Sequence, residues 1–188
     1  GARGVPGPLG DMLSRAAVPL WVAKTNDPAF PDESPVIHAG ERAAFRLEAS
    51  TFPRPGDPPG PEAPAGAHAV GVVISDTLPA EMTYVEGSAT LASEDLDGDG
   101  ALGPGEDRNG NGRIDLDVPF EPAIAADARS GDTVLGWRLG DLPARVRTPA
   151  IRFEARVSAV VPGGTALVNG AAIQEAGDRP PYCAWPRR

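Results

Sequence analysis

The sequence contains few residues of several types, and each shortage reduces the number of folds that it can adopt. Cys183 is the only cysteine, so no internal disulfide can form, while pairing between molecules or a free thiol both stay open. Aromatic residues make up 5% of the 188 residues, against 23 glycines and 22 prolines. This mixture predicts short strands joined by many turns rather than helices. No apolar run is long enough to span a membrane.

Catalytic and nucleic-acid-binding features are missing as well. The sequence has no serine nucleophile elbow, no H-E-x-x-H motif and no Walker lysine. Gly98, Gly100 and Gly103 match G-x-G-x-x-G, but the surrounding acidic residues would repel a pyrophosphate. The net charge is -9, and no basic patch is present for nucleic acid to bind. We therefore expect neither an enzyme nor a nucleic-acid-binding protein.

The acidity is concentrated in one stretch, residues 94–117. This stretch holds eight acidic residues and two arginines, a net charge of -6 out of the total of -9. Its first half has the spacing of a calcium-binding loop, in which positions 1, 3, 5, 6, 7 and 12 have defined roles. These positions are Asp95, Asp97, Asp99, Gly100, Ala101 and Glu106. The aspartates converge on a hard cation, the glycine allows the sharp turn, the carbonyl at position 7 adds an oxygen, and the glutamate closes the shell.

A second loop follows at once and is less complete. Its positions 1, 3, 5, 7 and 9 are Asp107, Asn109, Asn111, Arg113 and Asp115, and position 6 is again a glycine. Position 12 is Val118, so the closing carboxylate is absent, and Asp117 or a water molecule is expected to take its place. We predict one stronger and one weaker Ca²⁺ site within residues 95–118. The alternative is an acidic loop that is simply solvated.

Both loops resemble those of EF-hands, dockerins and thrombospondin-type calcium repeats. An EF-hand places a helix on each side of its loop. Here the second loop begins directly after Glu106, and the sequence before the first loop indicates a strand. Loops of weak to moderate affinity fit an extracellular setting, where calcium is abundant. We therefore expect calcium that stabilises an extracellular or cell-surface β-protein rather than a calcium switch.

Alternation of apolar and polar residues predicts a series of short strands. The clearest is residues 150–161, in which Ile151, Phe153 and Ala155 share one face while Arg152 and Glu154 share the other. The remaining predicted strands are residues 18–25, 41–50, 69–75, 82–85, 89–92, 132–139 and 166–173. Short strands with turn residues between them predict an all-β fold, an Ig-like antiparallel β-sandwich with a long calcium-binding loop inserted in it.

Four segments carry a more specific likeness. They are WVAKT at 21–25, DTLPAEMTYVEGSA at 76–89, WRLGDLPA at 137–144 and LVNGAAI at 167–173. Together they resemble the Ig-like conserved repeat of bacterial and archaeal surface proteins, a family long catalogued as a domain of unknown function. Those repeats typically open with a strand ending in Lys-Thr and close with Asn-x-Ala. The resemblance covers roughly residues 18–175 and implies a structural role at the cell surface, without catalysis.

Lys24 is the only lysine in the chain, against sixteen arginines. Unlike arginine, a lysine can lose its proton when buried and act as a nucleophile. In Ig-like domains of pili and adhesins, a first-strand lysine and a last-strand asparagine form an isopeptide bond assisted by a buried acid. The resemblance therefore suggests a Lys24–Asn169 crosslink assisted by Asp76, since burial would lower the pKa of the amine and raise that of the acid. The alternative is an exposed Lys24, with Asn169 and Asp76 bonded to backbone turns.

We expect three parts in the chain: an N-terminal extension over residues 1–17, the sandwich over residues 18–175 and a C-terminal tail over residues 176–188. The leading hypothesis is a calcium-stabilised structural subunit that assembles with copies of itself into a surface fibre or layer. Roughly residues 9–17 of the extension would add as a donor strand to an open sheet edge of the next copy. The alternative is an isolated Ig-like module of a larger adhesin or secreted enzyme.

Overall fold

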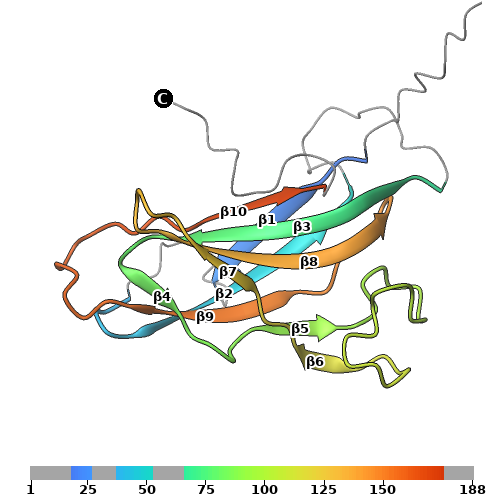
Figure 1. Ribbon diagram of the computed structural model, residues 1–188, viewed down its shortest axis with the longest axis horizontal. Helices are drawn as coiled ribbons and strands as arrows, with labels where there is room; N and C mark the ends of the chain where they lie inside the picture. The colour runs from blue at the N-terminus through green and yellow to red at the C-terminus, as the bar shows by residue number, and fades with distance from the viewer. Residues whose placement is uncertain (1–17, 27–36, 53–65, 176–188) are drawn as a thin grey trace, which may run out of the picture.

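The computed structural model describes residues 18–26, 37–52 and 66–175, which form two antiparallel sheets packed face to face (Figure 1). The first sheet has the strand order β1-β2-β9-β5-β6, with β4 also paired to β9, and the second has the order β10-β3-β8-β7. These residues contain no helix. The predicted all-β, Ig-like antiparallel sandwich is confirmed. The extension with its donor strand, the tail and Cys183 lie outside the described residues.

Most strands lie within a few residues of their predicted positions. The first sheet contains β1 (Trp21–Asn26), β2 (Arg42–Ser50), β4 (Met82–Tyr84), β5 (Thr90–Ser93), β6 (Leu116–Pro119) and β9 (Ile151–Val157). The second contains β3 (His68–Leu78), β7 (Ala123–Ala126), β8 (Thr133–Pro143) and β10 (Gly170–Gln174). The sequence did not predict β6 or β7. The last strand begins at Gly170 rather than at residue 166, so Asn169 lies directly before it.

The core lies between the sheets and is built from the alternating residues of the long strands. Phe45 on β2 lies opposite Phe153 on β9, and both side chains are buried. The Phe153 ring centroid is 5.3 Å from that of Phe45 and 5.2 Å from that of Trp137, which projects from the opposite sheet. The Trp137 indole N–H donates to the Phe120 carbonyl at 2.8 Å, so its one polar atom is satisfied inside the core.

Strand β3 carries one polar residue in an apolar series. Val72, Ile74, Asp76 and Leu78 alternate along the strand and are all fully buried. Because successive side chains of a strand point to opposite faces, these four share the face that packs against the first sheet. The strand therefore places the carboxyl group of Asp76 inside the core.

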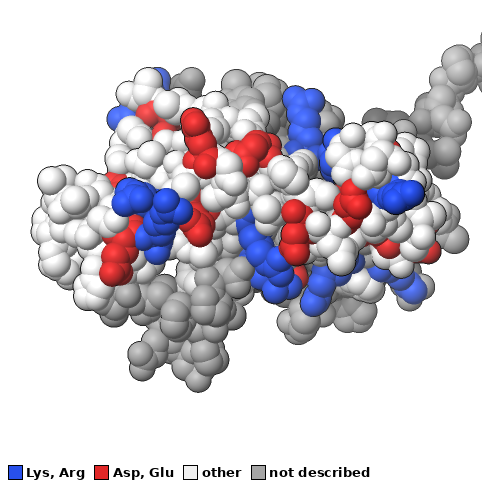
Figure 2. All heavy atoms as spheres, turned by 90° about the horizontal axis from the view of Figure 1, so that it is seen from below, with Lys and Arg blue, Asp and Glu red and all other residues white. Residues whose placement is uncertain are grey.

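The outer face of the first sheet is polar and mixed in charge. Its ion pairs include Arg42 with Glu154 at 2.8 Å and Arg152 with Asp117 at 2.9 Å. Figure 2 shows acidic and basic side chains next to one another on this side of the molecule. These exposed pairs contribute little stability, about 0–1 kcal/mol each. They keep one face of the sheet in water while the other packs, as the alternation in residues 150–161 predicted.

Within the described ranges there is no helix that is long and apolar enough to cross a membrane.

Candidate functional site

Strands β1 and β3 and the residue directly before β10 bring Lys24, Asp76 and Asn169 into one region of the interior. Lys24 on β1 lies opposite Leu47 on β2, which is fully buried, so both side chains point toward the second sheet. Asp76 on β3 lies opposite Ala171 on β10. Asn169 is two residues before Ala171 and therefore points to the same face, toward Asp76.

Lys24 and Asp76 form a buried ion pair. The Lys24 Nζ donates to the Asp76 Oδ2 at 2.5 Å, with 15% of the lysine side chain exposed and none of the aspartate side chain. The ammonium nitrogen also lies 4.6 Å from the ring centroid of Phe45 and 5.9 Å from that of Phe153. The only lysine of the chain is therefore held against two aromatic faces and one carboxylate, in surroundings that contain little water.

The carboxamide of Asn169 is buried, and neither its oxygen nor its nitrogen has a hydrogen-bond partner among the described residues. The second oxygen of Asp76, Oδ1, is buried and unpartnered as well. Leaving a buried polar group unsatisfied costs about 1–3 kcal/mol, so such groups are rare in native proteins. Three of them lie together here, so the cost of burying these polar atoms is not offset by hydrogen bonds among the described residues.

Burial has the largest influence on both ionisable groups. It lowers the pKa of Lys24, which the charge of Asp76 opposes, and it raises the pKa of Asp76, which Lys24 opposes. The nearby Asn169 amide lowers the pKa of Asp76 by a smaller amount, although the two groups do not meet the geometry of a full hydrogen bond. Both larger shifts favour a neutral amine beside a protonated carboxyl. A neutral amine is a nucleophile, and a protonated carboxyl can donate to a carbonyl oxygen.

An open groove with a volume of about 840 Å³ leads to this cluster. Lys24 and Asn169 both line it, together with Phe45 and the irregular segment of residues 161–167. The groove lies on the side of the sandwich where β1, at the edge of one sheet, contacts β10, at the edge of the other. The groove therefore runs beside the buried carboxamide and gives a small molecule such as ammonia a way out of the cluster.

The predicted calcium loops form an insertion between β5 and β6, at one end of the sandwich (Figure 1). The ends of the insertion lie side by side, because Ser93 pairs with Leu116 and the Glu94 N–H donates to the Asp115 carbonyl at 3.1 Å. In the first loop, Asp95 accepts three backbone N–H groups, including that of Gly100 at 3.0 Å. Gly100 has a φ of 82°, the left-handed conformation that the turn at position 6 requires.

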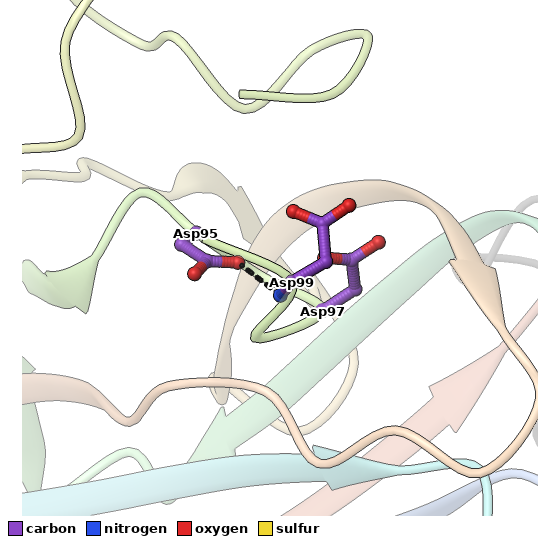
Figure 3. A group of neighbouring side chains, drawn as sticks. All are labelled: Asp95, Asp97 and Asp99. Carbon is purple, nitrogen blue, oxygen red and sulfur yellow. Dashed lines mark hydrogen bonds between the residues drawn. The ribbon is translucent and has the colours of Figure 1, made fainter. Parts of the chain in front are cut away.

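Asp95, Asp97 and Asp99 are brought together as the spacing predicted. One carboxylate oxygen from each lies within 4.8 Å of those of the other two, and Figure 3 shows all three on a single turn. This all-oxygen donor set fits a hard cation such as Ca²⁺. Glu106, the predicted closing ligand, lies apart from them in this structure, because its two oxygens accept the N–H groups of Leu96 and Gly103.

The second loop repeats the backbone geometry of the first. Asp107 accepts the N–H groups of Gly110, Asn111 and Gly112, as Asp95 does twelve positions earlier. Asp115 accepts hydrogen bonds from the side-chain amides of Asn109 and Asn111. The Arg113 N–H donates to the Asn111 side chain. Asp117 lies outside this arrangement and pairs with Arg152 instead.

Glu94, which was not among the predicted ligands, closes the second loop. Its carboxylate is fully buried and accepts the N–H groups of Arg108 at 2.7 Å and Asp115 at 3.1 Å, positions 2 and 9 of that loop. Glu106 accepts the N–H groups at positions 2 and 9 of the first loop. Each glutamate therefore fastens one loop. Glu106, at the end of the first loop, fastens the first, and Glu94, directly before the first loop, fastens the second.

An internal repeat in the sequence could have revealed Glu94. Residues 94–100 are EDLDGDG and residues 106–112 are EDRNGNG, so each loop is directly preceded by a glutamate, Glu94 for the first and Glu106 for the second. Counting forward from Asp107 leads to Val118 at position 12 and suggests that the closing group is missing. The repeat shows that the glutamate is supplied from the start of the insertion instead.

Arg108 attaches the insertion to the sandwich. Its guanidinium donates to the Leu139 carbonyl at 3.1 Å and lies 4.7 Å from the ring centroid of Phe120. Burial lowers the pKa of Arg108, and the charges of Glu94 and Glu106 oppose this shift. The arginine therefore places a compensating positive charge near the two buried glutamates.

Replacing Glu94 with glutamine is expected to lower the free energy of unfolding by about 1–3 kcal/mol, even without metal. The amide oxygen of glutamine can accept one of the two backbone N–H groups, but its NH₂ group would face the other. Urea denaturation measures the change, with Glu86→Gln, an exposed residue of a turn, as the matched control. Equal stability of the two variants would contradict a fastening role for Glu94.

Comparisons with known proteins found only distant likenesses among solved structures. No family model matches the chain, and no curated protein does. The structure is similar to BcpA, the major pilin subunit of Bacillus cereus, with 11% identity over 82% of this chain and 34% of that one, and a TM-score of 0.42. It is also similar to the T6 backbone pilin of Streptococcus pyogenes serotype M6, with 15% identity over 81% and 28%, and a TM-score of 0.39.

A third similar structure is the collagen-binding domain of the Erysipelothrix rhusiopathiae surface protein RspB. The identity is 15% over 82% of this chain and 38% of that one, with a TM-score of 0.37. The chain thus spans about a third of the length of each of these structures.

Proposed function

We propose that the chain is a non-enzymatic structural module of an extracellular surface protein, stiffened by an isopeptide bond between Lys24 and Asn169. The observation that carries the proposal is the buried Lys24–Asp76 pair beside the unpartnered carboxamide of Asn169. The bond would join β1 to the start of β10, which lie at neighbouring edges of the two sheets. The reaction would involve the three buried atoms that have no hydrogen-bond partner, which are the carboxamide oxygen and nitrogen of Asn169 and Oδ1 of Asp76.

The reaction needs no cofactor. The neutral Nζ of Lys24 attacks the carboxamide carbon of Asn169, while the protonated Asp76 donates to the carboxamide oxygen. The C–N bond to Nδ2 then breaks, and the proton lost by the amine passes through Asp76 to the leaving nitrogen. One ammonia departs through the groove, and Asp76 is regenerated. The Lys24 amine and the Asn169 carboxamide are consumed in forming the crosslink, so the reaction is a single self-modification and not catalysis on a substrate.

We expect purified protein to weigh less than its sequence by the mass of one ammonia. A proteolytic digest should contain a branched peptide that joins the segments around residues 24 and 169. Asn169→Ala and Lys24→Arg should each show the full mass and no branched peptide, since arginine keeps its proton and cannot form the amide. The matched control is Asn109→Ala, in the exposed second loop, which should retain the crosslink. Full mass in the unsubstituted protein would refute the bond.

We further propose that the insertion binds Ca²⁺ and that copies of the chain assemble into a surface fibre or layer. Support for the metal comes from the convergence of Asp95, Asp97 and Asp99 and from the repeated loop geometry. Assembly by strand donation requires an open sheet edge, and β1, β6, β7 and β10 are the outermost strands of the described sheets. Filaments in negative-stain images would support the fibre, and single particles alone would favour a module of a larger adhesin or secreted enzyme.

A further inference from the structure

The residue after Asn169 is a glycine, and neither packing nor backbone conformation requires one there. A Cβ atom built on Gly170 would meet nothing within 4 Å, and its φ is outside the left-handed region. By contrast, Gly100 and Gly112 both have positive φ values at the turns of their loops. What a glycine at position 170 does provide is a backbone nitrogen with no side chain beside it, directly next to the Asn169 carboxamide.

The chain has three Asn-Gly pairs, and Asn169 differs from the other two asparagines. In the second loop, the side-chain oxygens of Asn109 and Asn111 each accept a backbone N–H, and their nitrogens donate to Asp115. Those carboxamides are held at both ends. The carboxamide of Asn169 has no such bonds among the described residues, so no hydrogen bond holds it away from the nitrogen of Gly170.

From this geometry we propose that Asn169 is also a deamidation site, at which the backbone nitrogen of Gly170 closes a succinimide ring on the Asn169 side chain. The nitrogen of Gly170 forms a bond to the carboxamide carbon, the bond to Nδ2 breaks, and ammonia leaves with the proton lost by Gly170. Water then adds to either carbonyl carbon of the ring. Opening the ring yields aspartate or isoaspartate at position 169, and no oxidant or reductant is needed.

The surroundings of Asn169 favour this reaction. Asn169 directly precedes β10, an edge strand, and strand ends open locally more easily than strand centres. The groove beside Asn169 admits the water that opens the ring. Lys24 and Gly170 are therefore two nucleophiles that compete for one carboxamide.

The two outcomes have opposite structural effects. Attack by Lys24 ties β10 to β1, whereas isoaspartate inserts an extra methylene group into the main chain directly before β10. The added backbone atom changes how the chain enters β10, next to the first pair of the ladder, Gly170 with Thr77. This inference shares Asn169 with the proposed crosslink but does not require that the crosslink forms.

The test uses Lys24→Arg, which keeps a positive charge beside Asp76 but cannot form the amide bond. During storage at mildly alkaline pH, we expect the peptide that contains residues 169 and 170 to gain about one dalton and to accumulate isoaspartate. It should do so faster than the peptides that contain Asn109 and Asn111. Adding Gly170→Ala, which the structure accommodates, should slow this change several-fold.

Peptide mapping separates this inference from the crosslink, because succinimide formation and crosslinking both remove one ammonia. A linear peptide lighter by one ammonia is the succinimide, and a branched peptide is the crosslink. Modification of Asn169 in Lys24→Arg, with no branched peptide in the unsubstituted protein, would support the inference and refute the crosslink. If Asn169 stays intact while Asn109 and Asn111 are modified, the inference is overturned. Lys24→Met gives the same readout if the arginine variant does not fold.

Discussion

Substitution of Asp76 with alanine is expected to prevent the proposed Lys24–Asn169 bond and to lower the free energy of unfolding by several kcal/mol. Two effects combine. A crosslink between residues 24 and 169 closes a loop of about 145 residues, which the chain-entropy relation used for disulfides values at about 5 kcal/mol. Removing one partner of a buried ion pair costs a further ~3–5 kcal/mol, unless the lysine releases its proton. Intact mass shows whether the bond has formed, and guanidinium denaturation gives the total loss in the free energy of unfolding.

Asn169→Ala is the matched control for Asp76→Ala. It removes the crosslink but leaves Lys24 paired with Asp76, so its loss of stability reports the crosslink alone. The additional loss in Asp76→Ala then gives the cost of leaving the Lys24 amine buried without its partner. A crosslink that still forms in Asp76→Ala would show that this carboxyl is not the acid that assists the reaction.

Removal of calcium is expected to have the second large effect. A site that binds only the folded protein stabilises it by about 2.7 kcal/mol when free calcium is 100-fold above the dissociation constant. Without metal, the like charges of Asp95, Asp97 and Asp99 repel one another on one turn. We therefore expect the unfolding midpoint to fall on addition of a chelator and to recover with excess Ca²⁺. Mg²⁺, which demands a smaller octahedral shell, should restore less of it.

The variant Asp97→Asn tests whether calcium binds at this turn. The asparagine oxygen can still accept the Asp99 N–H that Asp97 accepts now, while one negative charge is removed. It should therefore weaken calcium binding without disturbing the metal-free loop. Equal stabilisation of this variant and the unsubstituted protein by calcium would place the ion elsewhere. Filaments that dissolve in chelator would put the metal at a joint between copies, and filaments that persist would assign it a role within each copy.

The sequence was sufficient for the two strands that alternate most clearly. Alternation in residues 41–50 and 150–161 gave β2 and β9 with their buried faces, because one side of each strand must avoid water. The strand predicted at residues 69–75 stopped before Asp76, whereas β3 extends to Leu78 and so brings Asp76 into line with Val72 and Ile74. Lys24 and Asn169 were singled out as residues, but their shared cluster depends on β1 and β10 meeting across two sheets. No local pattern encodes that contact.

The strands β6 and β7 could not be predicted, and the reason is physical. Both have four residues, lie at sheet edges and have mostly exposed side chains, so neither shows an apolar alternation. Their pairing with β5 and β8 comes from backbone hydrogen bonds, which the sequence does not display. The case of Glu94 is different, because the repeat of residues 94–100 at residues 106–112 signals the residue but not the groups that it binds. Its partners at positions 108 and 115 are distant in sequence, and only folding of the insertion brings them to it.

The insertion enters and leaves the sandwich at a single pair of adjacent residues, and this has a consequence for the evolution of the chain. Because Ser93 and Leu116 are already partners, a short turn between β5 and β6 could replace everything between them without moving either sheet. The entropy of closing a loop changes only slowly with its length, so such exchanges are well tolerated. A lineage of related domains could therefore acquire, lengthen or discard the metal-binding loops in one genetic event and keep its sandwich unchanged.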